Sequence, residues 1–466
     1  MTAALHALSV AELGALYRRG ELSPVEVARD VIAHVQRCEP TLHATWAFDP
    51  EAALAMAREA QTRYLRAQPL SALDGVPVTI KENIATQGLP LAMGSAASVL
   101  VPAAADAPPA ARLREAGAVF IARTTMPDYG MLSSGLSSFH AQFGGPARNP
   151  WDLSKTPGGS SAGAGAAAAA GYGPLHLGTD IGGSIRLPAG WCGIFGLKPS
   201  NGRIPIQPPY AGRAAGPMTR SVRDAALAMA VLSQPDWRDA ASLPYQPLAW
   251  DDLNIELRGL KIGLLMDAGW GLAVDPEIAS AVRAAAQRFE AAGAHIEEMA
   301  AFTTREMADG INLFWRMRSW LDIAALPPER RARVLPYIRE WVAAGESCSA
   351  AQLFHGYSQM AALRDAAVAA CRPFDFVLSP VSPVPAFAAE HASPTNDPLR
   401  AMEHIGFTLP YNMSEQPAAS IDCGHTTAGL PIGLQIIGTR HDDLGVLRLA
   451  HAWEQMRPAP RPWPTI

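Results

Sequence analysis

Two glycine- and serine-rich segments lie near the middle of the sequence: TPGGSSAGAGAAAAAG (residues 156–171) and GTDIGGSIRLPAGWCGIFGLKPS (residues 178–200). Glycine permits positive φ angles and a close approach of backbone to a ligand, and each segment presents a serine in such a context. Irregular backbone inside a compact enzyme commonly lines a functional site. We therefore expect the site to be built around Ser160 and Ser184.

The sequence on both sides of this centre alternates between predicted helices and strands. Capping boxes at Ser9 and Ser23 predict two N-terminal helices. Apolar runs and alternating patterns predict strands in GVPVTIKEN (residues 75–83), AVFIART (residues 118–124), LKIGLL (residues 260–265) and GLPIGLQIIG (residues 429–438). This alternation favours an α/β fold.

We expect a single domain, because we find neither an internal repeat nor a clear linker. It would span residues 1–466, with N-terminal helices in residues 1–65, a core in residues 66–245 and a C-terminal part in residues 246–466.

The GTDIGGS motif points to nucleophilic attack on a carbonyl group. Consecutive backbone N–H groups of Ile181, Gly182 and Gly183 precede Ser184. Such a nest can hold the oxyanion of a tetrahedral intermediate while the neighbouring hydroxyl attacks. The motif therefore predicts an oxyanion hole beside a serine nucleophile.

A serine nucleophile needs a base, and the upstream strand supplies a candidate. Lys81 follows the alternating residues of GVPVTIKEN, and it can act as a base if burial lowers the pKa of its amine. Ser160 can then relay the proton between Lys81 and Ser184. No histidine is needed in this scheme.

The GGSS cluster, GTDIGGSIR and GVPVTIKEN resemble the amidase signature family over nearly the whole chain. The resemblance extends to MPDYGM (residues 126–131) and GPARNPWD (residues 145–152). It implies an α/β amidase signature fold, a large twisted mixed β-sheet flanked by α-helices. It also implies a catalytic triad with Ser184 as nucleophile, Ser160 as relay after a cis peptide bond, and Lys81 as base.

Other positions take supporting roles in the same resemblance. Asp180 and Arg186 are expected to form a structural ion pair beside the nucleophile, with Ser161 as a further supporting residue. The expected substrate-binding residues are Met131, Leu132, Phe139, His140 and Tyr210.

The chain departs from the family pattern at three places, one of which is Ala162, where the family commonly has Gly. Glu82 stands where the family commonly has Asp, and Phe139, His140 and Ala141 replace a Thr-Glu-Asn stretch. Because this stretch borders the acyl pocket in the family, the change favours an apolar or aromatic acyl group over glutamine. It disfavours the glutaminase subunit of the tRNA amidotransferase.

We expect a hydrolase of linear carboxylic amides that works through an acyl-enzyme on Ser184. Hydrolysis of esters and of carbamates (urethanes) stays open, because the same nucleophile can attack those carbonyls. GSSAG (residues 159–163) also fits a nucleophile elbow, so an α/β-hydrolase-type esterase using Ser161 is one alternative. The preceding NPWDLSKTP makes a poor strand for that elbow. A catalytically inactive binding protein of the same fold is the other alternative.

Composition limits the partners. The 38 Lys and Arg against 43 Asp and Glu give a net charge of −5 without a long basic run, which disfavours nucleic acid. No apolar run is long enough for a membrane span. The 5 cysteines and 12 histidines show no metal-ligand spacing, and no cofactor or metal is implied. We expect a cytoplasmic monomer or homodimer acting on a small-molecule amide, ester or carbamate.

Overall fold

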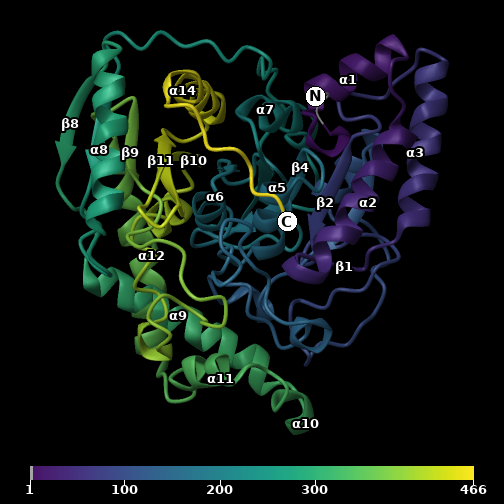
Figure 1. The fold of residues 1–466 in the computed structure, drawn as a ribbon. Helices are drawn as coiled ribbons and strands as arrows, with labels where there is room; N and C mark the ends of the chain where they lie inside the picture. The colour runs from purple at the N-terminus through teal and green to yellow at the C-terminus, as the bar shows by residue number, and fades with distance from the viewer. Residues whose placement is uncertain (1–3) are drawn as a thin grey trace.

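A computed structural model describes residues 4–466, which build one 11-stranded β-sheet covered by helices (Figure 1). The strands are β1 (Thr45–Trp46), β2 (Pro77–Lys81), β3 (Val119–Thr124), β4 (Leu175–Asp180), β5 (Phe195–Lys198), β6 (Ala214–Thr219), β7 (Lys261–Leu265), β8 (His295–Met299), β9 (Phe376–Pro380), β10 (Ala418–His425) and β11 (Pro431–Gly438). Their spatial order is β1-β3-β2-β4-β6-β5-β10-β11-β9-β7-β8. Parallel pairing of β3, β2 and β4 and of β9, β7 and β8 alternates with antiparallel pairing elsewhere, so the sheet is mixed.

The α-helices lie in groups along this sheet. They are α1 (Val10–Arg19), α2 (Pro24–Leu42), α3 (Pro50–Leu65), α4 (Pro108–Glu115), α5 (Ala162–Ala170), α6 (Arg186–Cys192), α7 (Val222–Leu232), α8 (Pro276–Ala291), α9 (Arg305–Ala324), α10 (Pro328–Arg331), α11 (Pro336–Ala343), α12 (Ala350–Cys371), α13 (Leu409–Met413) and α14 (Asp443–Met456). Short 3₁₀ helices are η1 (Leu5–Ala7), η2 (Asp128–Gly130), η3 (His140–Phe143) and η4 (Pro398–Arg400). Helices α1 to α3 gather near the β1 end of the sheet, and α9 to α12 gather at the bottom of Figure 1.

Parallel pairing in the centre brings the sequence motifs together. Strands β2 and β4 are parallel neighbours, and Ile80 pairs in register with Leu177. Parallel neighbours end at the same edge of a sheet. Lys81, the last residue of β2, and the loop that follows Asp180 at the end of β4 therefore meet at one edge.

Helix α5 follows Ser161 and is buried along its whole length. Its alanines and glycines allow close packing. The N–H of Gly163 donates to the carbonyl oxygen of Thr125, just past the end of β3, at 3.0 Å. Small residues thus let the helix approach the sheet closely.

The expected α/β fold with a large mixed sheet flanked by helices is confirmed. The capping boxes at Ser9 and Ser23 begin α1 and α2, as the sequence predicts. The single domain over residues 1–466 stays a prediction.

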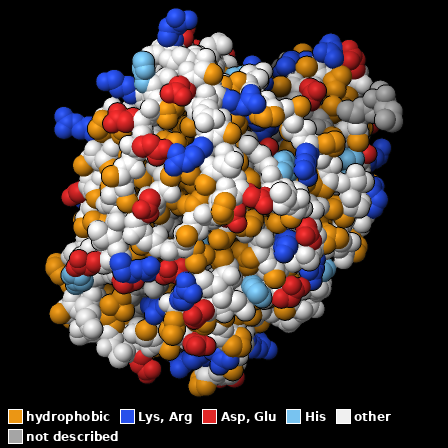
Figure 2. Space-filling model, turned by 60° about the vertical axis from the view of Figure 1, so that its left-hand side comes forward, with side chains coloured by type: hydrophobic (Ala, Val, Ile, Leu, Met, Phe, Trp, Pro, Cys, Tyr) orange, Lys and Arg blue, Asp and Glu red, His pale blue; other side chains and the backbone are white. Residues whose placement is uncertain are grey.

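Two surface properties bear on possible partners. Within residues 4–466, no helix combines the length and hydropathy that a membrane crossing requires. On the face drawn in Figure 2, Lys and Arg side chains are interspersed with Asp and Glu.

Close packing of α5 makes a stability prediction. Gly163→Ala adds a methyl group that would overlap the carbonyl oxygen of Ala44 and the backbone nitrogen of Thr125. We expect a loss of about 1–3 kcal/mol in the free energy of unfolding, despite the higher helix propensity of alanine. Chemical denaturation followed by circular dichroism measures it.

The matched control is Gly14→Ala in α1, where the nearest atom to the added methyl is Arg18 Nη1 at 3.5 Å. That variant should be neutral or up to about 1 kcal/mol more stable. Equal stability changes in the two variants would contradict the role assigned to the close packing of α5.

Candidate active site

The amine of Lys81 is fully buried at the end of β2 and surrounded by hydroxyl groups. Its Nζ donates to Ser160 Oγ at 2.8 Å, to Ser161 Oγ at 3.0 Å and to Thr179 Oγ1 at 3.0 Å. None of these contacts is to a carboxylate. The predicted contact between Lys81 and Ser160 is thus present.

The surroundings of Lys81 favour its neutral form. Burial, followed by the nearby cation of Arg213, holds the pKa of Lys81 well below its usual range, and Asp180 and Glu82 oppose this only in part. An amine that is neutral near pH 7 can accept a proton. The geometry and the charge distribution therefore agree with a base at this position.

Ser160 and Ser184 both line one large cavity. Ser160 is buried, and the peptide bond between Gly159 and Ser160 is cis. Ser184 is half-buried, and its hydroxyl has no hydrogen-bond partner among residues 4–466. The carbonyl oxygen of Ser184 accepts a hydrogen bond from the N–H of Ser161 at 3.2 Å, which ties the two serine-rich segments together. The Ser184 hydroxyl is left free to meet a ligand in the cavity.

Two of the three predicted oxyanion donors are available. Ile181 and Gly182 line the cavity, and their N–H groups have no acceptor within the part of the chain that the structure describes. The N–H of Gly183 instead donates to Asp180 Oδ1 at 2.8 Å. This N–H is therefore already hydrogen-bonded to a carboxylate and is not available to a ligand. The expectation for Gly183 is corrected accordingly.

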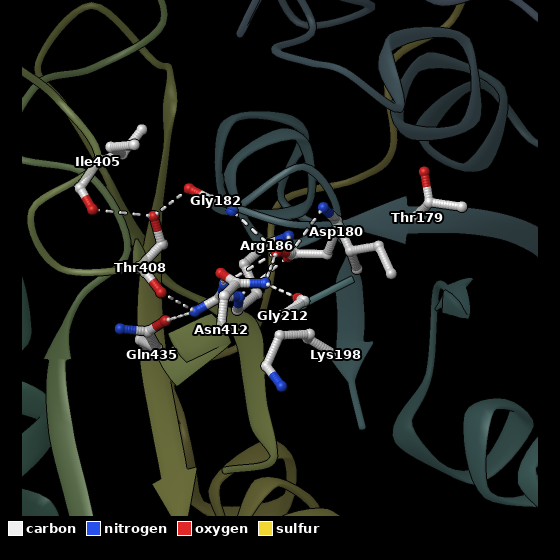
Figure 3. A network of polar contacts seen from close by, with 12 residues as sticks. Thr179, Asp180, Gly182, Arg186, Lys198, Gly212, Ile405, Thr408, Asn412 and Gln435 are labelled. Atoms are coloured by element: carbon white, nitrogen blue, oxygen red, sulfur yellow. Dashed lines mark hydrogen bonds and ion pairs between the residues drawn. The ribbon is translucent and has the colours of Figure 1, made fainter. Parts of the chain in front are cut away.

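Asp180 and Arg186 form the expected structural ion pair (Figure 3). Arg186 Nε donates to Asp180 Oδ2 and Nη2 donates to Oδ1, each at 3.0 Å, with both side chains fully buried. Arg186 also donates to Asn412 and Gln435, which joins the segment after β4 to α13 and β11. Burial alone would raise the pKa of Asp180, but Arg186 outweighs it and holds that pKa well below its usual range.

Ser161 is a contact of Lys81 and not a residue of the cavity wall. Its hydroxyl donates to Thr179 O at 3.1 Å and accepts from the Thr179 N–H at 3.2 Å. Irregular backbone, not a strand, precedes it. The nucleophile elbow needs such a strand and an exposed hydroxyl. Ser161 has neither, so the α/β-hydrolase alternative fails on geometry.

The cavity has a volume of about 650 Å³. Of the predicted pocket residues, Met131, Leu132 and Tyr210 line it. The C-terminal part contributes further lining residues that the sequence did not predict, which are Trp315, Arg318, Ser319, Asp322, Trp341, Met402 and Ile405. They belong to no recognisable motif, and the only signal is the helical spacing of the α9 residues.

Phe139 and His140 do not line this cavity, which corrects their predicted role. Phe139 packs edge-on against Trp46, with ring centroids 5.3 Å apart. The Nε2–H of His140 donates to Glu82 Oε1 at 2.8 Å in a buried pair. Two of the three departures from the family pattern, Glu82 and the segment 139–141, thus contact each other through His140. They lie next to the end of β2 and do not line the cavity.

Within the described residues, 4–466, no group of three or more His, Cys, Asp or Glu side chains could hold a metal ion.

The Asp180–Arg186 ion pair gives a stability prediction with a defined pH dependence. Asp180→Asn leaves the buried Arg186 without its counter-ion and should cost about 3–5 kcal/mol near neutral pH. Because the folded-state pKa of Asp180 is depressed, its contribution is present above the unfolded pKa of about 3.9 and declines as the pH falls below it.

Urea unfolding of the unmodified protein and of Asp180→Asn between pH 7 and pH 3 measures the difference in their free energies of unfolding. This difference should become smaller as the pH falls. Asp365→Asn is the control, because that side chain is 78% exposed and should change stability by less than about 0.5 kcal/mol. A difference that is independent of pH would contradict this account of Asp180.

Comparison with known proteins agrees with this geometry. Residues 26–447 match the Amidase family. A glutamyl-tRNA(Gln) amidotransferase subunit from Myxococcus xanthus is 35% identical over 479 residues, which cover 96% of this chain and 97% of that protein. A bacterial aryl acylamidase of the amidase signature family superposes with a TM-score of 0.88 at 29% identity, covering 97% of each chain. The 6-aminohexanoate cyclic dimer hydrolase superposes with a TM-score of 0.82 at 26% identity, covering 98% of each chain. The chain therefore belongs to the amidase signature family of C–N bond hydrolases.

Proposed function

We propose that the protein hydrolyses linear carboxylic amides through an acyl-enzyme on Ser184, with Lys81 as base and Ser160 as proton relay. The observation that carries this proposal is the fully buried Lys81 amine, 2.8 Å from Ser160 Oγ, behind a cavity that Ser184 also lines. A buried, hydroxyl-bound amine beside a free serine hydroxyl is the arrangement that a serine nucleophile with a lysine base requires.

The first half of the reaction follows from these positions. Ser184 Oγ bonds to the substrate carbonyl carbon while its proton passes through the Ser160 hydroxyl to Lys81 Nζ. The N–H groups of Ile181 and Gly182 stabilise the resulting oxyanion. The C–N bond then breaks, and the proton held by Lys81 returns through Ser160 to the leaving amine.

In the second half, water attacks the ester carbonyl of the acyl-enzyme. Its proton passes to Lys81, and the Ser184 oxygen leaves with a returned proton. The free acid is released and the starting state restored. Esters and carbamates offer the same carbonyl to the same nucleophile, so we include them in the proposed scope.

The cavity wall supports substrates with an apolar or aromatic group. Met131, Leu132, Trp341 and Ile405 provide apolar surface, and Trp315 lies beside the nucleophile loop. These side chains, and not Phe139 and His140, favour an apolar or aromatic acyl group. This preference fits the aryl acylamidase among the structural relatives, whose name describes that protein and not this chain.

A second candidate is the amide of glutamine, favoured by the 35% identity to an amidotransferase component over nearly the full length. The two candidates are separated by incubating the purified protein with glutamine or with an anilide. Release of ammonia from glutamine without release of aniline would favour the second candidate. We expect the reverse, because the cavity wall is rich in aromatic and aliphatic side chains.

The proposed roles make a mutational prediction. Ser184→Ala should abolish anilide hydrolysis with folding intact, and Lys81→Ala should reduce it nearly as far, by roughly 10⁴-fold or more. Ser161→Ala should be far milder, because Ser161 contacts Lys81 and Thr179 but does not line the cavity. Arylamine release with 4-nitroacetanilide measures activity, and thermal unfolding checks folding. If Ser161→Ala were the inactivating change, the assignment of Ser184 would be wrong.

The position of Arg213 makes a prediction about pH. Protonation of Lys81 removes the base, so kcat/KM for a neutral anilide should fall as the pH drops through the Lys81 pKa. The cation of Arg213 lowers that pKa. Arg213→Gln should therefore raise it and move the acid limb of the profile to higher pH.

Arg364→Gln is the control for that profile, since it removes the same charge from a half-buried site on α12 that lies outside the cavity. Its acid limb should coincide with that of the unmodified protein. A profile of Arg213→Gln that also coincides would contradict the proposed influence of Arg213 on Lys81.

A further inference from the structure

Two arginines line the cavity without a protein counter-ion. Arg213 immediately precedes β6, and Arg318 lies on α9. Arg213 Nη1 donates to Pro208 O at 2.9 Å, and the guanidinium carbon of Arg318 lies 4.6 Å from the centre of the Tyr210 ring. Among residues 4–466, neither arginine forms an ion pair with a carboxylate. The two cations are thus held together at one cavity wall.

Holding these cations together is unfavourable without a bound anion. Burial, and then the neighbouring charge of Arg318, lower the pKa of Arg213 to about 10. Within the part of the chain that the structure describes, buried hydrogen-bonding groups nearby also lack partners, namely Arg318 Nε, the Tyr210 hydroxyl and Trp315 Nε1, in a tryptophan that is only 7% exposed. All three can donate hydrogen bonds. A wall rich in donors and poor in acceptors matches an anionic ligand.

The acidic residues of the cavity do not neutralise this wall. Asp106 and Asp180 are each paired with an arginine outside the cavity lining. Asp322 lines the cavity one turn beyond Arg318 on α9, but it is exposed and forms no ion pair within the described residues. One exposed carboxylate thus faces two partly buried cations.

Helix α9 extends from this cavity wall to the loop that contains Ser184. Trp315, Arg318, Ser319 and Asp322 line the cavity at spacings of three and four residues, so they occupy one face of the helix. A methyl group on Gly182 would lie 3.3 Å from the Trp315 ring, which places Trp315 at the nucleophile loop. Arg318 lies about 4.5 Å farther along the helix axis. An anion bound there is about one helical turn from the Trp315 position.

We propose that Arg213 and Arg318 bind a carboxylate carried by the amide substrate, so that the protein prefers acidic amides to neutral ones of equal size. The proposal rests on the proposed amide hydrolysis for its substrate, while the carboxylate site itself can be tested by binding alone. The carboxylate can belong to the acyl part or to the amine part of the substrate, and the test has one arm for each.

Binding is measured first, by calorimetry with the Ser184→Ala protein. In the acyl arm, the succinic monoanilide anion is compared with the neutral valeric anilide. In the amine arm, 4-acetamidobenzoate is compared with 4-methylacetanilide. We expect one charged ligand to bind about 10- to 100-fold more tightly than its neutral counterpart. Adding Arg318→Gln should remove that preference, and adding Asp322→Asn should strengthen it.

Arg305→Gln on the same helix is the matched control, because Arg305 is half exposed, pairs with Glu403 and lies outside the cavity. It should leave the preference unchanged. Thermal unfolding verifies that each variant is folded. The ratio of kcat/KM between charged and neutral anilides, measured with the Ser184-containing proteins, should fall in Arg318→Gln mainly through KM.

Equal affinity for charged and neutral ligands in both arms would overturn the proposal. So would a preference that survives in Arg318→Gln or that Arg305→Gln removes equally. If no anilide is hydrolysed while the charged ligand still binds through Arg318, the carboxylate site stands and the proposed function fails. If anilides are hydrolysed with an unchanged ratio in Arg318→Gln, the function stands and the carboxylate site fails.

Discussion

A fully buried lysine amine, whose pKa burial lowers, is the constraint on which the rest of the site depends. Lys81 has only hydroxyl groups within hydrogen-bond distance, although the carboxylate of Asp180 lies close enough to raise its pKa. A free carboxylate there would favour the ammonium form. Arg186 pairs with both carboxylate oxygens of Asp180 and so compensates the negative charge that would otherwise act on Lys81. The buried ion pair thus stabilises the turn after β4, and it also limits the effect of Asp180 on the pKa of Lys81.

The sheet provides the geometry that this chemistry needs. Because β2 and β4 are parallel neighbours, Lys81 and the loop after Asp180 meet at one edge without a long connection between them. Helix α5 holds the segment that includes Ser160 against the same edge, and only residues without large side chains permit its close packing. The arrangement is rigid where hydrogen-bond lengths matter, since buried side chains and backbone fix each contact.

The sequence predicted the reacting end of the site better than the binding end. The contact of Lys81 with Ser160 and the position of Ser184 on the same cavity could be anticipated, because the proposed roles of base, relay and nucleophile require particular residue types in a glycine-rich setting. The occupied N–H of Gly183 could not be predicted, because it depends on the direction in which the Asp180 side chain turns. Phe139 and His140 were misplaced because the pairing of His140 with Glu82 depends on how η3 packs. The lining residues of α9 lie far along the chain, in a helix whose sequence carries no motif.

This division explains why relatives with different names share one fold. The proposed base, relay and nucleophile come from residues 81–184, whereas much of the cavity wall comes from residues 207–213 and 315–322 and from Met402 and Ile405. Substitutions in the second set alter the size and charge of the cavity without disturbing the contacts of Lys81. Identity over the whole chain averages over all positions, and most of these lie outside the cavity wall. The identities of 35% to an amidotransferase component and 29% to an aryl acylamidase therefore rank overall divergence, and the cavity residues decide the substrate.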